Sequence, residues 1–323
     1  MLTRRELLAT TVVAGAVQGL GLSFAQAQTL DMLKMFVPAA PGGGWDQTAR
    51  SLEAALRATK AVNGVQITNV PGAGGAVGMP QFLNQWKGQG NALMVAGMVM
   101  VGALIANKSP FSLTQVTPIA RLTGEFLALC VPAGSAFKSA KDFADALKAD
   151  PTKVPVAGGS AGGSDHILLG MIAKAVGAQP AKVSYVAFSG GGPATAALLG
   201  SQVAAGISGY GEFGEQIKAG KLRVLAISAD KRVDGIDAPT LKEQGIDVEL
   251  FNWRGVFAPP GVNDAQRTAM IAVIEKLAAS KEWAETCKRQ DWTQITLTGA
   301  DYGKFITEET ARIGGILKEL GLA

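Results

Sequence analysis

Short hydrophobic runs alternate with longer amphipathic segments along most of the chain. The runs predict strands, and the segments in which apolar residues recur every three or four positions predict helices. The predicted strands are Met32–Val37, Val65–Val70, Ala92–Ala96 (continuing into a helix up to Ala106), Phe126–Val131, Val154–Ala157, Val183–Ala187, Val203–Ile207 and Leu222–Ala229. The predicted helices are Trp45–Thr59, Asp142–Ala149, Asp165–Val176, Asp264–Ala279 and Asp301–Leu320. This alternation is typical of an α/β fold with a mainly parallel sheet.

Length, composition and charge exclude several classes of function. The chain has 323 residues, of which 48% are hydrophobic and 17% charged, so it is a globular protein of about two domains. The formal net charge is only +4, from 30 Lys and Arg against 26 Asp and Glu, which is too little for a nucleic-acid partner. One His and two Cys in the whole chain exclude a His/Cys zinc site, so no metal is expected.

Residues 1–27 have the pattern of a secretory signal peptide. Arg4 and Arg5 precede an apolar run from Leu7 to Leu22, and an Ala-Gln-Ala cleavage pattern ends at Ala27. The run is shorter than the ~20 apolar residues that a membrane span needs. The paired arginines also fit a twin-arginine signal, so both export routes stay open. We therefore expect the mature protein to work in a periplasm, which is an oxidising compartment.

The two cysteines allow a single disulfide, between Cys130 and Cys287. Cys130 lies in the apolar run Phe126–Val131, where a thiol commonly serves as a small hydrophobic group. Two buried free thiols are therefore favoured over a bridge.

The chain has four glycine-rich turns, and three of them follow a predicted strand and open a helix. Glycine lets backbone N–H groups approach a ligand closely, and a helix N-terminus adds unpaired donors and a partial positive charge. The turns are Pro41–Gly44, Gly72–Gly75, Gly158–Ser164 and Ser189–Pro193. A single turn of this kind can be explained by backbone geometry alone. Four in one chain favour a common cleft that binds an anion.

Two motifs point to other functions. Gly158–Gly162 matches the G-x-S-x-G nucleophile elbow, with Ser160 as the nucleophile, but the single histidine, His166, lies six residues on in the same predicted helix. A triad needs a histidine brought in from elsewhere, so a hydrolase is disfavoured. The pair Gly72 and Gly74 is a partial dinucleotide fingerprint without its third glycine. No cofactor is therefore expected.

The side chains next to these turns allow two interpretations. Asp46 and Asp165 each fall in the first turn of a predicted helix, where a carboxylate commonly caps free N–H groups. Trp45 and Tyr210 could wall a cleft or pack in the core.

Several segments together resemble a known family. They are VPAAPGGGWDQTAR (37–50), NVPGAGGAVG (69–78), GGSAGGSDHILLG (158–170), SYVAFSGGGPATAALLGSQVAAGISGYGE (184–212), GKLRVLAIS (220–228), APTLKEQGIDVEL and NWRGVFAPPG. In this order they resemble the substrate-binding receptors of tripartite tricarboxylate transporters, the Bug family, and the Trp-Asp and Gly-Tyr-Gly-Glu motifs resemble its tricarboxylate-type subgroup. Pro193 departs from that subgroup, which typically carries Glu after the triple glycine.

The resemblance implies a type II periplasmic binding protein, in which two α/β lobes surround a central cleft and are joined by two crossing strands. Residues 28–130 and 252–323 would form lobe 1, and residues 131–251 would form lobe 2. The family holds ligand carboxylates with backbone amides, hydroxyls and water. Carried over, the ligand-binding residues would be Pro41, Gly42, Gly43, Gly44, Trp45, Asp46, Ala73, Gly74, Ser160, Ala161, Gly162, Gly163, Ser164, Ser189, Gly190, Gly191, Ser208, Gly209 and Tyr210.

The function implied is that of an extracytoplasmic receptor, not an enzyme. It would bind a small di- or tricarboxylate such as citrate as a monomer and deliver it to a membrane permease of the tripartite system. The alternative is a secreted, hydrolase-like enzyme that acts on a carboxylate through Ser160, with Asp165 and His166 as partners.

Overall fold

The computed structural model describes residues 30–323, so the predicted signal peptide lies outside the described residues. The strands are β1 (Leu30–Val37), β2 (Val62–Asn69), β3 (Ala92–Gly97), β4 (Thr117–Pro132), β5 (Val156–Gly158), β6 (Tyr185–Ala187), β7 (Ala205–Gly209), β8 (Leu222–Ile227), β9 (Phe251–Ala258) and β10 (Thr293–Thr298). The α-helices are α1 (Gly44–Ala58), α2 (Gly78–Gln85), α3 (Met98–Ala106), α4 (Ala140–Ala149), α5 (Ser164–Ala175), α6 (Gly191–Leu199), α7 (Tyr210–Lys218), α8 (Asp264–Ala278), α9 (Lys281–Arg289) and α10 (Gly299–Glu319). The α/β alternation predicted from the hydrophobic pattern is confirmed.

The strands form a curled sheet in the order β2-β1-β3-β9-β4-β7-β5-β6, and β8 and β10 also pair with β4. Pairs among β1, β2 and β3 are parallel, as are those among β5, β6 and β7. All pairs that involve β4 or β9 are antiparallel. The sequence predicted a mainly parallel sheet, which is only partly right: the sheet is mixed, with two parallel groups separated by antiparallel central strands.

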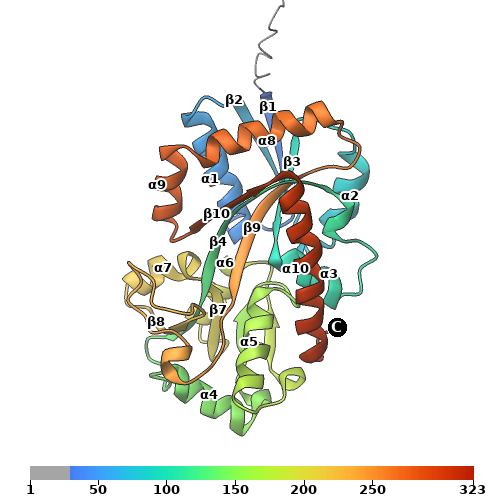
Figure 1. Ribbon diagram of the computed structural model, residues 1–323. Coiled ribbons are helices and arrows are strands. Elements are labelled where there is room, and N and C mark those ends of the chain that lie inside the picture. Colours follow the sequence, from blue (N-terminus) through green and yellow to red (C-terminus); the bar gives the residue numbers. More distant parts are fainter. Residues whose placement is uncertain (1–29) are drawn as a thin grey trace, which may run out of the picture.

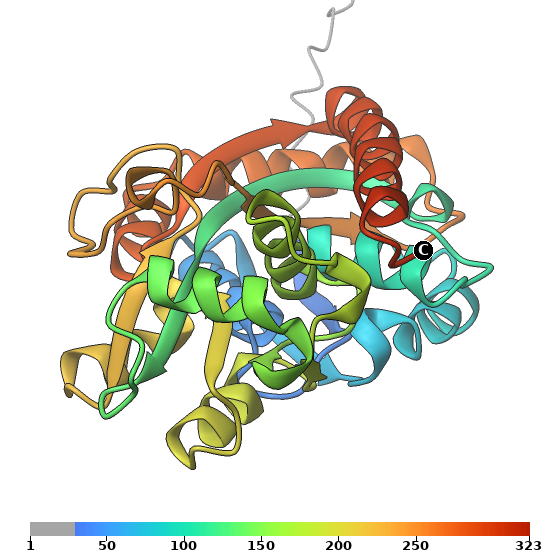
Figure 2. The ribbon, with the colours of Figure 1, turned by 90° about the horizontal axis from the view of Figure 1, so that it is seen from below.

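Strand β4 joins the two halves of the sheet. Its first part, Thr117–Phe126, pairs with β9, and its last part, Leu127–Pro132, pairs with β7 and β8. Figure 1 shows β4 and β9 running through the middle of the molecule, and Figure 2 shows β4 curving beside β10. The predicted strand Phe126–Val131 is only the end of β4, because polar residues interrupt the earlier apolar pattern.

Helices cover the two parallel groups separately. Helix α1 packs on β1 and β2 and contacts α9, whereas α6 packs on β5 and β7 and contacts α7 (Figure 1). This two-part arrangement is the architecture expected of a two-lobed binding protein. The exact lobe boundaries, 28–130 with 252–323 and 131–251, stay a prediction.

The C-terminal helix α10 reaches from one part of the molecule to the other (Figure 1). Its last residue, Glu319, forms an ion pair of 2.8 Å with Lys174 of α5. Leu320 lies close to Gly170: a Cβ atom on Gly170 would be 2.9 Å from the Cδ1 atom of Leu320. The end of α10 is therefore packed on α5, on the far side of the central strands from β1.

Both cysteines are buried and free, which confirms the prediction of two free thiols. None of the helices in residues 30–323 has the length and apolar character required to cross a membrane.

Candidate functional site

A cavity that opens to solvent lies between the two groups of parallel strands. Its wall is built by the turns after β1, β2, β5, β6 and β7, together with side chains from α3, α5, α7 and β9. The turns lie at the carboxyl ends of parallel strands, which is where open α/β sheets bind ligands.

Eleven of the residues predicted to bind ligand line this cavity. They are Gly43, Gly44, Trp45, Gly74, Ser160, Ser164, Ser189, Gly190, Gly191, Ser208 and Gly209. The other eight do not line it, namely Pro41, Gly42, Asp46, Ala73, Ala161, Gly162, Gly163 and Tyr210. All four glycine turns nevertheless contribute to the wall or lie directly beside it.

Internal contacts explain why several of these eight residues lie outside the lining. The carboxylate of Asp46 is buried and accepts hydrogen bonds from the N–H of Gly42, from Arg50 at 2.8 Å and from Asn69 at 3.0 Å. The backbone of Gly162 packs against α3, where a Cβ atom on Gly102 would overlap the Gly162 carbonyl oxygen. Asp46 therefore supports the turn before α1 through the N–H of Gly42, but it does not cap the N–H groups of the helix itself.

The four helices that begin beside the cavity share one feature. Helices α1, α5, α6 and α7 have the glycine N-caps Gly43, Gly163, Gly190 and Gly209, and none of these helices has a side-chain cap. Of the other helices, α4, α8 and α9 are capped by the side chains of Ser139, Asn263 and Ser280, whereas α2, α3 and α10 also lack a side-chain cap. Helix N-termini without side-chain caps present N–H donors and a partial positive charge. Those of α1, α5, α6 and α7 converge on one cavity.

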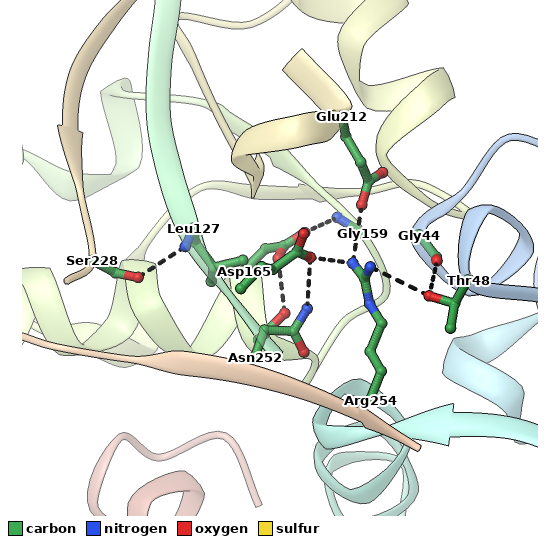
Figure 3. Close-up of polar contacts among 11 residues, drawn as sticks. Gly44, Thr48, Leu127, Gly159, Asp165, Glu212, Ser228, Asn252 and Arg254 are labelled. Atoms are coloured by element: carbon green, nitrogen blue, oxygen red, sulfur yellow. Dashed lines mark hydrogen bonds and ion pairs between the residues drawn. The ribbon is translucent and has the colours of Figure 1, made fainter. Parts of the chain in front are cut away.

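A cluster of buried charged side chains forms one wall of the cavity (Figure 3). Arg254 on β9 forms an ion pair with Glu125 on β4, and both side chains are 3% exposed. The same guanidinium lies 3.7 Å from Glu212 of α7, whose side chain is 9% exposed. Asn252 donates a hydrogen bond of 3.3 Å to Glu125. Arg254 is the centre of this cluster.

Strand register brings the cluster together. In the β4–β9 pair, Thr123 lies opposite Arg254 and Glu125 lies opposite Asn252. Residues two apart on a strand share a face of the sheet, so Glu125, Asn252 and Arg254 point to the same side.

Three of the cavity glycines make room for this cluster. A Cβ atom on Gly44 would overlap the Arg254 guanidinium, one on Gly191 would overlap Glu212, and one on Gly209 would overlap Glu125. These glycines are therefore needed for the close approach of charged side chains to the backbone, as well as for the turns.

Burial shifts the pKa values of the acidic groups in the cavity. Burial raises the pKa of Asp165 to about 6, although the N–H of Gly159 and the hydroxyl of Ser164 donate hydrogen bonds that oppose the rise. Burial and the neighbouring Glu125 raise the pKa of Glu212 to about 8, and Arg254 offsets this only in part. Burial also raises the pKa of Glu125, while Arg254 and Asn252 lower it. Burial therefore favours the protonated, uncharged forms of these acids.

The sequence interpretation missed Glu125, Glu212, Asn252 and Arg254 as cavity residues. The signal was present, because Arg254 and Asn252 interrupt the apolar run Phe251–Phe257, and Glu125 directly precedes Phe126–Val131. Charged residues are rarely buried unless they are paired, so a charge inside a predicted core strand marks a buried partner. The sequence could not indicate which partner it was.

His166 is not arranged as a catalytic base. Its Nδ1 atom accepts the N–H of Gly162 at 3.1 Å, and its ring stacks on Tyr185 with the centroids 4.3 Å apart. Burial lowers the pKa of His166 to about 4. No hydrogen bond joins Ser160 to His166 among the described residues. Ser160 instead lies opposite Gly74, where an added Cβ atom would be 3.1 Å from the Cβ atom of Ser160.

The chain has the two-lobed fold of the periplasmic binding proteins. The chain resembles the solved structure of the periplasmic binding protein BugD, with a TM-score of 0.80 and 23% identity over 90% of this chain and 98% of that one. It also resembles MatC from Rhodopseudomonas palustris with bound malate (TM-score 0.77, 22% identity, 89% and 99% covered). A third structure, from R. palustris with adipate, has a TM-score of 0.79 and 18% identity, with 90% and 97% covered.

The chain belongs to the tripartite tricarboxylate transporter receptor family, whose pattern matches residues 48–322. Among curated relatives, protein BugT from Bordetella pertussis is 28% identical over 295 residues, which cover 90% of this chain and 89% of BugT. The family resemblance inferred from the glycine turns is confirmed.

Proposed function

We propose that this protein is an extracytoplasmic receptor for a di- or tricarboxylate such as citrate, which it delivers to a membrane permease of a tripartite tricarboxylate transporter. The observation that carries the proposal is the convergence of four helix N-termini without side-chain caps on one cavity. Carboxylate oxygens accept hydrogen bonds and carry negative charge, so they complement this arrangement.

The polar groups of the cavity support a small acid as ligand. Ser160, Ser189 and Ser208 line it and supply hydroxyl donors, and Arg254 supplies a buried positive charge. Two similar structures contain malate and adipate, which are small dicarboxylates. The ligand-binding set proposed here comprises the eleven predicted residues that line the cavity together with Arg254, Glu212 and Asn252.

The mechanism we propose is closure of two lobes around the ligand. The cavity is lined from one side by the turns of β1 and β2 and from the other by those of β5, β6 and β7. A ligand that touches both sides stabilises the closed state relative to the open one, and the permease can distinguish the two states. Receptor function of this kind needs export to the periplasm, and a monomer is sufficient for it.

The competing proposal is a hydrolase-like enzyme that uses Ser160. The contacts of His166 with Gly162 and Tyr185 disfavour it, because the Nδ1 lone pair is already engaged and burial disfavours the charged ring. A turnover assay with each bound acid tests it. Product formation by the wild-type protein that is lost in Ser160→Ala would support the enzyme and contradict a pure receptor.

The receptor proposal is tested by thermal unfolding of the mature protein after co-purified ligand has been removed. The panel is citrate, tricarballylate, malate, succinate and adipate, with the corresponding amides as neutral controls. An acid at 100 times its Kd adds about 2.7 kcal/mol to the free energy of unfolding, which is a shift of several degrees. Stabilisation by one or two acids and not by their amides is expected. Absence of any shift would contradict the proposal.

A further inference from the structure

Buried negative charge in the cavity exceeds buried positive charge. Glu125, Asp165 and Glu212 line the cavity or pack on it, and Arg254 is the one guanidinium among them. Moving an unpaired carboxylate out of water is costly, and the usual response of such a group is to bind a proton. An acidic ligand would add further negative charge to the same space.

The three carboxyl groups differ in how well they are hydrogen-bonded. Glu125 has Arg254 and Asn252 as donors, and Asp165 accepts hydrogen bonds from Gly159 at 2.7 Å and from Ser164 at 2.9 Å. In contrast, the buried Oε2 atom of Glu212 has no hydrogen bond of ordinary geometry among the described residues, although the N–H of Gly191 lies close enough to lower the pKa of this carboxyl. Glu212 is therefore the least well hydrogen-bonded of the three acids, so a proton on its Oε2 atom displaces the fewest donors.

The position of Glu212 is suited to contact with a ligand. A Cβ atom on Gly44 would overlap the Arg254 guanidinium and lie 2.8 Å from Oε1 of Glu212, so these three residues meet at the N-terminus of α1. Figure 3 shows Arg254 extending from β9 between Glu212 and Thr48. A ligand carboxylate placed beside the α1 N-terminus would contact both the guanidinium and Glu212.

We propose that ligand binding takes up one proton on Glu212, whose neutral carboxyl group then donates a hydrogen bond to a ligand carboxylate held beside Arg254. The proton comes from the solvent and resides on a carboxyl oxygen of Glu212 in the closed complex. This inference rests on the proposed function, since it requires that the ligand be an acid.

The groups that face Glu212 come from several elements. They are Glu125 of β4, Asp165 of α5 and Arg254 of β9, with the uncharged Gly44 of α1, Gly191 of α6 and Ser208 of β7. Two of the three charged neighbours are negative, and burial acts in the same direction, which raises the pKa of Glu212 to about 8. In an open cleft water would replace part of this burial, so the pKa of the same carboxyl would be lower than in the closed one.

Proton uptake on Glu212 makes the affinity for the ligand depend on pH. Because closure raises the pKa of Glu212, affinity for the ionised acid falls as the pH rises toward and through the raised value of about 8. If binding takes up one proton, the Kd rises by up to about tenfold for each pH unit. Between pH 7 and 8 both carboxyls of malate are ionised, so the slope measured with malate reports the protein.

The test is calorimetric titration of the mature protein with malate and with citrate at pH 7.5 in phosphate and in Tris buffer. The two buffers differ in ionisation enthalpy, so the difference in observed enthalpy gives the number of protons taken up. We expect uptake approaching one proton per ligand for the wild-type protein. Glu212→Gln keeps an N–H donor without a titratable proton, so it should bind with a Kd within about tenfold of wild type at pH 7.5 and take up almost none.

Glu215→Gln is the matched control, because Glu215 lies on the same helix and is exposed. It should bind and take up protons as the wild type does. If the wild-type protein binds an acid without taking up a proton, this inference is overturned and the proposed function remains. This outcome does not depend on whether the Glu212→Gln protein folds. Uptake that persists in Glu212→Gln would also overturn the inference. Failure of both acids to bind would remove the proposed function and the inference together.

Discussion

Gly190 contacts Gly43 across the cavity: a Cβ atom placed on Gly190 would lie 3.4 Å from the Cα atom of Gly43. Gly43 follows β1 and Gly190 follows β6, so the contact joins turns that the sequence separates by more than 140 residues. Backbone from the two parallel groups therefore meets directly, with no side chain between. This contact describes a closed cleft, and it depends on glycine at both positions.

Gly43→Leu is expected to prevent this closure. The Cβ atom itself would lie 3.4 Å from the Ala40 oxygen and 3.8 Å from the Gly190 Cα atom, but the longer leucine side chain would occupy the space of the Ser189–Gly190 turn. Overpacking typically costs ~1–3 kcal/mol, so we expect acid affinity to fall at least about tenfold, as measured by calorimetry. The melting temperature of the ligand-free protein should change little. Gly134→Leu, where a Cβ atom meets nothing within 4 Å, is the control. Unchanged affinity in a folded Gly43→Leu protein would remove this turn from the binding site.

Arg254→Met should strongly destabilise the fold. Removal of the guanidinium leaves Glu125 buried without its positive partner, and breaking a buried pair in this way costs about 3–5 kcal/mol. Urea unfolding at pH 7 measures the loss. Arg57→Met, which removes a surface pair with Glu53, should have little effect. Adding Glu125→Gln to Arg254→Met should recover part of the stability, and a loss no larger than that of Arg57→Met would contradict the role given to the pair.

Asp46→Asn tests whether this carboxylate is structural. Burial raises the pKa of Asp46, but hydrogen bonds from Arg50, Gly42 and Asn69 lower it more, so the net shift is downward. An acid whose pKa is lower in the folded than in the unfolded state stabilises the fold at pH values above its unfolded-state pKa. This stabilisation is lost as the pH falls through its folded-state pKa. The substitution should cost about 2 kcal/mol at pH 7 and progressively less below about pH 4. Asp145→Asn, at an exposed pair, is the control for urea unfolding at both pH values. An equal cost at pH 7 and pH 2.5 would show that the charge of Asp46 is irrelevant.

Thiol labelling should distinguish the native from the unfolded protein. Cys130 and Cys287 are both buried, and burial raises the pKa of each thiol, to about 12 for Cys287. Reaction needs the thiolate, so an aromatic disulfide reagent at pH 8 should label neither residue in the native state. In guanidinium chloride it should label both. Detection of fewer than two thiols after unfolding would indicate a disulfide in the protein as isolated.

The sequence by itself determined the local elements and the glycine turns. The strand and helix patterns gave most elements within a few residues, because buried strands and amphipathic helices have distinct periods. The largest error was β4, where Thr117, Arg121 and Glu125 obscure the apolar pattern. Strand β10, which has no buried residue, was missed, as were the helices α2, α7 and α9. Glycines before the predicted helices correctly located the turns that border the cavity.

Only the tertiary structure decided which charges share the cavity. Glu125 and Arg254 are 129 residues apart, and they meet because the β4–β9 register places them on one face of the sheet. Glu212 joins them because α7 begins at the end of β7, beside β4. Local periodicity records whether a residue is buried, whereas its long-range neighbour depends on strand order and register, which no local pattern encodes. For this reason the sequence indicated an anion-binding cleft, and only the packed sheet revealed the buried arginine and the acids that surround it.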